Sequence, residues 1–199
     1  MSQLLTIIVP TYNRAACLAM LLDALTVELR GFEDRVDVVI GDNASVDDTP
    51  NVTATFASQW TATHLLRHAE NLGPDENFCR CVEVVRTPYF WIIGDDDLPR
   101  AGAIPLLIQL LETHNPDLVY LNSRWSSTLS SHKEAGTVSH LNASLMSREA
   151  FARSVHVWTT FISGAIVKRE LARDESLRRF TGSMLVQLGW VLGALRDGC

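Results

Sequence analysis

Two kinds of hydrophobic pattern alternate along the first 122 residues of the chain. Continuous apolar runs rich in branched and aromatic residues predict buried strands at 4–9, 36–40, 61–66, 89–93 and 118–121. Apolar residues at helical spacing predict helices at 18–29, 74–85 and 104–111, and a capping box at Ser45–Asp48 predicts a helix at 45–60. Regular alternation with short connections is typical of βαβ units. We therefore predict an α/β fold, with a mostly parallel central sheet flanked by helices.

The pattern changes after residue 122. A Ser-rich stretch at 123–131 leads to a short helical segment at 148–154 and a strand-like run at 161–167. A last helix is predicted at 184–195, with its apolar side chains at Leu185, Leu188, Trp190, Val191, Leu192 and Leu195. These side chains fit core packing, and they also fit a surface that faces an acceptor or a membrane.

Composition and charge narrow the function. The chain has 199 residues, of which 47% are apolar and 20% charged, as expected for one globular domain. Its formal net charge of −6 argues against a nucleic-acid partner, which would need a basic face. No apolar stretch reaches the ~18–20 residues that span a bilayer. The four cysteines form no C-x-x-C pair, and no signal peptide is visible, so we expect free thiols and a cytoplasmic protein.

Polar clusters follow three of the predicted strands. Thr11-Tyr12-Asn13-Arg14 follows the first strand, Asp42-Asn43 the second, and Asp95-Asp96-Asp97 the fourth. Ligands of open parallel sheets bind at the carboxyl ends of the strands, so these clusters should converge. Neither G-x-G-x-x-G nor G-x-x-x-x-G-K-[ST] occurs at the strand ends, which disfavours a dinucleotide fold and a P-loop.

Three adjacent carboxylates are difficult to keep ionised together unless a cation lies beside them. Mg²⁺ or Mn²⁺ is the natural partner of carboxylate oxygens, and such an ion takes further ligands from substrate phosphates. A metal bridge would allow this acidic chain to bind an anionic diphosphate. The plainer alternative is that Asp95–Asp97 forms a solvated turn before the next helix.

Four motifs in this order resemble family 2 glycosyltransferases of the GT-A fold. They are Pro10-Thr-Tyr-Asn-Arg14, Asp42-Asn-Ala-Ser45 with Asp47-Asp48-Thr49, Asn71-Leu-Gly73, and Gly94-Asp-Asp-Asp97. The runs Asn71–Asn77 and Trp91–Asp97 are similar to an abequosyltransferase-like branch of bacterial surface-polysaccharide synthesis. The resemblance covers residues 4–122 well and the remainder loosely.

The resemblance implies a role for each matching residue. Pro10, Thr11, Tyr12, Asn13 and Arg14 would form the nucleotide pocket, and Asp42 would accept a hydrogen bond from a base, commonly uracil or another pyrimidine. Asn71 and Asn77 would lie near the donor sugar or diphosphate. Asp95 would contact the ribose or the metal, Asp96 would bind the metal directly, and Asp97 would complete the metal site or contact the donor sugar.

Inverting relatives use a carboxylate to deprotonate the acceptor. The region that corresponds to their acidic motif, Phe180–Trp190, contains no carboxylate. Asp97, Asp174 and Glu175 are the weak candidates for this base, which stays unassigned.

The resulting prediction is a single GT-A-like domain that uses Mn²⁺ or Mg²⁺ to transfer a hexosyl or deoxyhexosyl group. The donor would be a UDP- or other pyrimidine nucleotide-sugar, and the acceptor a glycan or a lipid-linked sugar. Residues 1–122 would be the nucleotide-sugar-binding half and 123–199 the acceptor-side half. Relatives commonly continue further, so truncation at the C-terminus stays open, as does peripheral contact with the inner face of the membrane. The rivals are a non-catalytic nucleotide-sugar-binding module and a sugar-phosphate nucleotidylyltransferase.

Overall fold

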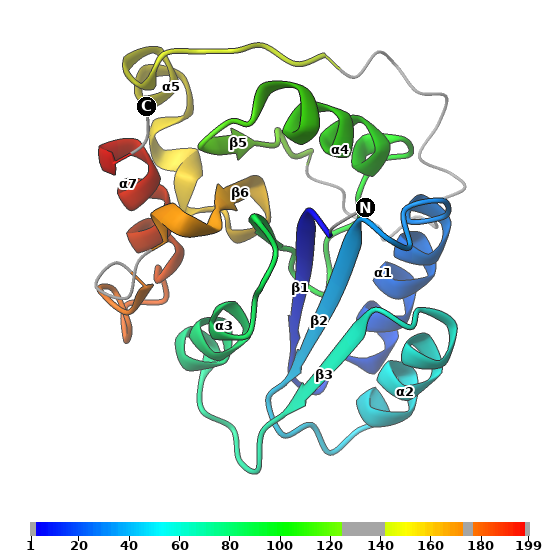
Figure 1. Ribbon diagram of the computed structural model, residues 1–199. Coiled ribbons are helices and arrows are strands. Elements are labelled where there is room, and N and C mark those ends of the chain that lie inside the picture. The colour runs from blue at the N-terminus through cyan, green and yellow to red at the C-terminus, as the bar shows by residue number, and fades with distance from the viewer. Residues whose placement is uncertain (1–2, 125–141, 173–176, 198–199) are drawn as a thin grey trace.

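The computed structural model describes residues 3–124, 142–172 and 177–197 (Figure 1). Its strands are β1 Leu5–Thr11, β2 Val36–Asp42, β3 Thr63–Arg67, β4 Tyr89–Ile92, β5 Leu118–Tyr120 and β6 Ala165–Lys168. Its α-helices are α1 Ala15–Glu28, α2 Thr49–Gln59, α3 Pro74–Glu83, α4 Ala103–His114, α5 Arg148–Val155 and α7 Gln187–Asp197. Short 3₁₀ helices are η1 His156–Thr160, η2 Ile162–Gly164 and η3 Arg169–Leu171.

The strands form one six-stranded sheet in the order β3-β2-β1-β4-β6-β5. β3, β2, β1 and β4 pair in parallel, whereas β6 is antiparallel to both of its neighbours. The predicted α/β fold with a mostly parallel sheet is therefore confirmed. The alternation along the chain did not reveal that β6, from the second half, lies between β4 and β5.

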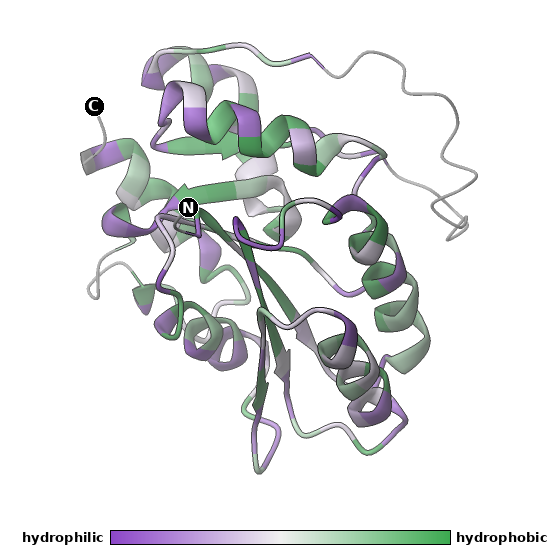
Figure 2. Ribbon diagram, turned by 45° about the vertical axis from the view of Figure 1, so that its right-hand side comes forward, coloured by the Kyte–Doolittle hydropathy of each residue, from purple (hydrophilic) through white to green (hydrophobic). Residues whose placement is uncertain are grey.

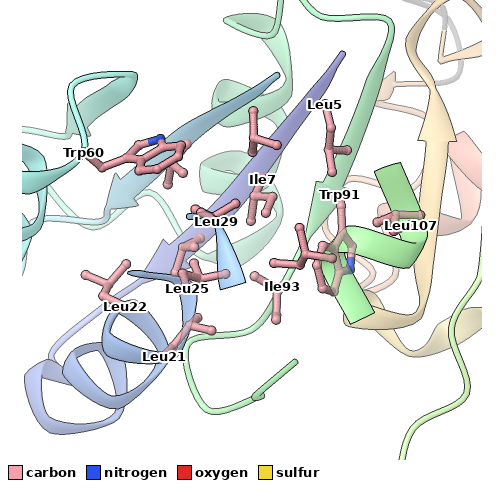
Figure 3. Close-up of a cluster of buried hydrophobic side chains, with 14 of the residues drawn as sticks. Leu5, Ile7, Leu21, Leu22, Leu25, Leu29, Trp60, Trp91, Ile93 and Leu107 are labelled. Atoms are coloured by element: carbon pink, nitrogen blue, oxygen red, sulfur yellow. The ribbon is translucent and has the colours of Figure 1, made fainter. Parts of the chain in front are cut away.

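Helices cover both faces of the sheet, which explains the continuous apolar runs of its central strands. Every residue of β1 and β2 is buried. On one face, leucines of α1 pack against Leu5 and Ile7 of β1, with Trp60 and Trp91 beside them (Figure 3). On the other face, α3 and α7 cover the alternate residues of β1 and β4. The hydropathy colouring shows the apolar strands between these layers (Figure 2).

The contacts of α7 support the interpretation of the last helix as core packing more than its interpretation as an exposed surface for an acceptor. The Trp190 ring lies edge-on to Phe90, with 5.6 Å between ring centroids, and Val191 is buried beside it. Leu192 on the outer side is 50% exposed. The helix begins at Gln187 and not at 184, because Met184 has a positive φ of 64° that an α-helix does not accommodate. No helix in the described part of the chain is long and apolar enough to cross a membrane.

Two local expectations were wrong. Ser45 does not cap the second helix: its hydroxyl accepts a hydrogen bond from the Asn13 backbone N–H, and α2 begins at Thr49. The run at 161–167 is only partly a strand. Its first half turns through η2, and pairing with β4 and β5 begins at Ala165.

Candidate donor-binding site

The polar clusters that follow β1, β2 and β4 meet at the carboxyl edge of the parallel strands. Thr11 is paired with Asp42 in the sheet register. The Thr11 hydroxyl donates to Asp95 Oδ2 over 2.7 Å, and its carbonyl accepts from the Asn43 N–H over 3.0 Å. Convergence of these clusters was the central structural expectation from the sequence, and these contacts confirm it.

Asp95 is the buried member of the acidic triplet. Its residue is only 4% exposed. Burial raises the pKa of the Asp95 carboxyl, while the Thr11 hydrogen bond and the nearby Arg14 guanidinium act in the opposite direction. Arg14 Nη1 lies 3.0 Å from Asp95 Oδ1. Both oxygens of Asp95 therefore already have partners within the protein.

Asp96 and Asp97 point to different partners. Asp96 is exposed, and its Oδ2 accepts from Arg14 Nη2 over 2.6 Å. Asp97 Oδ2 accepts from the Ser163 hydroxyl over 2.6 Å. Burial raises the pKa of the Asp97 carboxyl, and the Ser163 hydrogen bond opposes this effect. One oxygen of each, Asp96 Oδ1 and Asp97 Oδ1, accepts no hydrogen bond from the described residues.

Gly94 leaves the space in which these carboxylates gather. A Cβ at this position would lie 3.1 Å from Asp97 Oδ2 and 3.2 Å from Asp96 Oδ1, closer than side chains normally approach. The described residues contain no group of three or more His, Cys, Asp or Glu side chains that could hold a metal by themselves. The uncommitted oxygens of Asp96 and Asp97 instead fit an ion such as Mg²⁺ or Mn²⁺ that takes its other ligands from phosphates.

Asp42 lies at the end of β2 with one oxygen in use and one without a hydrogen bond. Its Oδ1 accepts from the Ser45 N–H over 2.9 Å. Its Oδ2 is buried without a hydrogen-bond partner, 3.5 Å from Arg67 Nη1. A cavity of about 150 Å³ adjoins this carboxylate, lined by Ile40, Asp42, Pro50, Thr53, Leu65, Leu66 and Arg67. Asp42 can therefore accept a hydrogen bond from a ligand there.

The residues around Thr11 differ in their exposure and in their contacts. Pro10 is buried within β1, and Tyr12 is 42% exposed at its end. Asn13 has a φ of 53° and braces the neighbouring loop, because its Oδ1 accepts from the Val46 N–H. Tyr12 is thus available to a ligand, whereas the Asn13 backbone N–H and side-chain oxygen serve the turn.

The two asparagines expected near the donor sugar differ in the same way. Exposed Asn71 lies at the edge of the site, and its Oδ1 accepts from Asn43 Nδ2 over 2.8 Å. Asn77 is 2% exposed and lies on α3, where its Nδ2 donates to the Gly41 carbonyl of β2 and its Oδ1 contacts His68 Nε2. The structure therefore brings Asn71 near the converging clusters and uses the Asn77 amide within the fold.

Two residues of the site were missed from the sequence. Arg67 ends β3 beside Asp42, so the rule that ligands bind at strand ends could have found it. Ser163 contacts Asp97 from 66 positions away in the chain, and no local motif marked it.

The expected base stays unassigned. Asp174 and Glu175 lie outside the described residues. The carboxylate that contacts the 180–190 region is Asp75 of α3, whose Oδ2 accepts from the N–H groups of Gly182 and Met184. Asp75 is 6% exposed, so it anchors this segment and is poorly placed to meet an acceptor.

Comparison with known proteins agrees with this geometry. The family model described as "Glycosyl transferase family 2" matches residues 6–175, which is most of the chain. The chain belongs to glycosyl transferase family 2. It is 30% identical over 134 residues to abequosyltransferase RfbV of Salmonella typhimurium. That match covers 67% of this chain but only 37% of RfbV.

Solved structures share the fold at lower sequence identity. S. aureus TarS (residues 1–349) superposes with a TM-score of 0.73 and 16% identity, covering 97% of this chain and 55% of that one. TarS has also been solved with UDP-GlcNAc. The mannosyltransferase PcManGT from Pyrobaculum calidifontis, solved with GDP-Man and Mn²⁺, gives a TM-score of 0.60 and 21% identity over 86% of this chain and 46% of its own. The chain thus spans about half the length of these structures.

Proposed function

We propose that this chain binds a nucleotide-sugar and transfers its sugar to a glycan or a lipid-linked acceptor. The observation that carries the proposal is the junction of Thr11, Asp95, Arg14 and Asp96 beside Asp42, at the edge where parallel sheets bind ligands. Membership of glycosyl transferase family 2 supports the reaction class. It argues against the nucleotidylyltransferase alternative.

The cavity beside Asp42 is the proposed nucleobase site. The buried Asp42 Oδ2 can accept an N–H of the base, and Arg67 can donate to a ring carbonyl. Uracil presents an imide N–H between two carbonyls, which suits this pair, and the UDP complex of TarS is consistent with that choice. A pyrimidine nucleotide-sugar is therefore the favoured donor.

The acidic turn is the proposed diphosphate site. Asp96 and Asp97 each have one uncommitted oxygen for a divalent ion, and Asp95, which Thr11 and Arg14 hold in place, would contact the ribose. When bound there, Mg²⁺ or Mn²⁺ would neutralise the diphosphate and stabilise it as the leaving group. PcManGT was solved with Mn²⁺, and glucosyl-3-phosphoglycerate synthase from Mycobacterium tuberculosis with UDP and Mn²⁺ or Mg²⁺, which supports this choice of ion.

The acceptor would approach from the second half of the domain. We assign residues 1–122 to donor binding and 123–199 to the acceptor side, because the residues of the proposed donor site lie in the first half except for Ser163. The similarity to an abequosyltransferase, together with the motifs that resemble that branch, supports a role in bacterial surface-polysaccharide synthesis on the cytoplasmic side of the membrane. A non-catalytic binding module is the second candidate, because Phe180–Trp190 contains no carboxylate.

Calorimetric titration with UDP tests the donor site. We expect UDP to bind with Mn²⁺ or Mg²⁺ present and far more weakly with EDTA. Asp96→Ala should abolish the metal-dependent part because it removes a proposed ligand. Asp23→Ala, a change at an exposed carboxylate of α1, is the matched control and should bind like the wild type. Equal, metal-independent binding by wild type and Asp96→Ala would rule out the metal bridge.

Release of nucleotide from a panel of nucleotide-sugars tests turnover. A glycosyltransferase should release nucleoside diphosphate from one donor class in the presence of acceptor glycans. Tight donor binding without release from any donor would favour the binding module.

A further inference from the structure

Ser163 lies at the contact between the two halves of the domain. It sits in η2, directly before β6, and is only 6% exposed. β6 places it beside the acidic turn, because Ile166 of β6 pairs with Trp91 of β4 in the antiparallel register. A residue far away in the chain is thereby fixed next to the carboxylates that follow β4.

Ser163 makes three hydrogen bonds to the segment that carries the acidic turn. Its hydroxyl donates to Asp97 Oδ2 over 2.6 Å and accepts from the Gly94 N–H over 2.8 Å. Its carbonyl accepts from Trp91 Nε1 over 2.8 Å. One hydroxyl proton and one lone pair are therefore used at once, which fixes both the backbone of the turn and the direction of the Asp97 carboxylate.

Contacts with β5 and α7 also fix the segment that contains Ser163. Gly164, its neighbour, lies against the Tyr120 ring so closely that a Cβ there would come within 2.7 Å of the ring. On the other side, Gln187 at the start of α7 donates from Nε2 to the Thr160 carbonyl over 2.6 Å. β5, β6 and α7 thus brace the short segment that presents the Ser163 hydroxyl.

We propose that Ser163 is a positioning residue that orients the Asp97 carboxylate toward the metal–diphosphate group. The second half of the domain thereby completes the donor site. With Asp97 Oδ2 held by Ser163, the carboxylate presents Oδ1 to the ligand. This inference rests on the donor site described under the proposed function. Asp96 has no comparable restraint from the described residues of the second half, since its partner is Arg14 of the first.

Three variants separate positioning from general stability. Ser163→Ala removes the hydroxyl, and Ser163→Thr keeps it as the conservative rescue. Thr87→Val is the matched control: it deletes a buried hydroxyl that donates to the Tyr89 carbonyl at the start of β4, away from the acidic turn. Ser163→Cys, a fourth variant, keeps the size but donates weakly, and it carries the test if Ser163→Ala does not fold.

Two readouts are measured on the full chain. The first is amide hydrogen exchange in the peptide that contains residues 94–97, without any ligand. We expect faster exchange in Ser163→Ala, a return toward wild type in Ser163→Thr, and no change in Thr87→Val. The second is the dissociation constant for UDP with Mn²⁺, by calorimetry. It should rise about tenfold in Ser163→Ala, the effect of losing one hydrogen bond to a charged group, and recover in Ser163→Thr.

The outcomes distinguish this inference from the proposed function. Unchanged exchange at residues 94–97 in Ser163→Ala, or in Ser163→Cys where it is the variant used, would overturn the positioning role. Unchanged UDP–Mn²⁺ affinity in that variant would overturn it as well, and so would equal effects of Thr87→Val. If the wild type binds no UDP with Mn²⁺, the donor site fails instead, and the exchange readout still decides whether Ser163 orders the turn.

Discussion

At the scale of single residues, the cation that neutralises the acidic turn in this structure is Arg14. Its guanidinium donates to Asp96 with one nitrogen and contacts Asp95 with the other, and these two carboxylates raise the pKa of Arg14. A divalent ion would compete with Arg14 for the same carboxylate charge. We therefore expect Arg14 to affect metal binding without being a metal ligand.

Replacing Arg14 with Gln should strengthen the binding of Mn²⁺ alone. Loss of the guanidinium leaves the charge of Asp95 and Asp96 without its internal partner, so we expect an affinity about threefold to tenfold higher, as for ion pairs that are partly exposed. Electron paramagnetic resonance of free Mn²⁺ measures this without nucleotide. Arg153→Gln, which breaks an exposed pair with Glu149 on α5, is the control. Equal or weaker Mn²⁺ binding by Arg14→Gln would contradict the competition.

At the scale of elements, α7 packs against one face of the sheet. Trp190 contacts Phe90 of β4 with its ring, and its Nε1 donates to the Leu177 carbonyl over 3.1 Å. Val186, Val191 and Ala194 are buried around it. α7 thereby covers the sheet face opposite to α1.

Trp190→Ala should lower the free energy of unfolding by about 3–5 kcal/mol, because it leaves a large cavity and removes one hydrogen bond to the Leu177 carbonyl. Leu192→Ala on the outer side of the same helix should change it by less than about 1 kcal/mol, since that residue is half exposed. Urea titration followed by circular dichroism gives both values. Similar losses in the two variants would show that α7 is not packed as the structure has it.

How far the sequence predicted these elements depends on the range of the interactions that form them. The buried runs of β1 and β2 are local patterns, and the rule that ligands bind at strand ends was enough to bring Thr11, Asp42 and Asp95 together. The insertion of β6 depends on pairing between residues more than 70 positions apart, which periodicity does not encode. The contact of Ser163 with Asp97 follows from that insertion and was missed for the same reason.

Local hydrogen bonding explains the remaining differences. The motif around Ser45 has the residues of a helix cap. The Ser45 hydroxyl instead accepts a hydrogen bond from the Asn13 N–H in the turn after β1. Asn77 lies in a motif that resembles the family's, yet its amide holds α3 to the Gly41 carbonyl. In both cases a polar side chain that looked available in the sequence is used by a neighbouring element.

At the scale of the whole molecule, an acidic chain is proposed to bind an acidic ligand. The formal net charge is −6, so the protein's overall field repels a nucleoside diphosphate. Under the proposed function, binding therefore comes from local donors and from a cation shared by the protein and the diphosphate. Nucleotide and metal should then depend on each other for affinity.

This mutual dependence predicts how the chain responds to heat. A ligand that binds only the folded state at a hundred times its dissociation constant stabilises it by about 2.7 kcal/mol. For a domain of this size, that corresponds to a rise of roughly 5–10 °C in melting temperature. We expect UDP with Mn²⁺ to give this rise. UDP with EDTA, or Mn²⁺ alone, should give much smaller shifts, and Asp96→Ala should respond weakly to the combination. Differential scanning calorimetry measures all four conditions. Equal shifts from UDP with and without Mn²⁺ would mean that Arg14 and Arg67 hold the nucleotide directly, without a bridging cation.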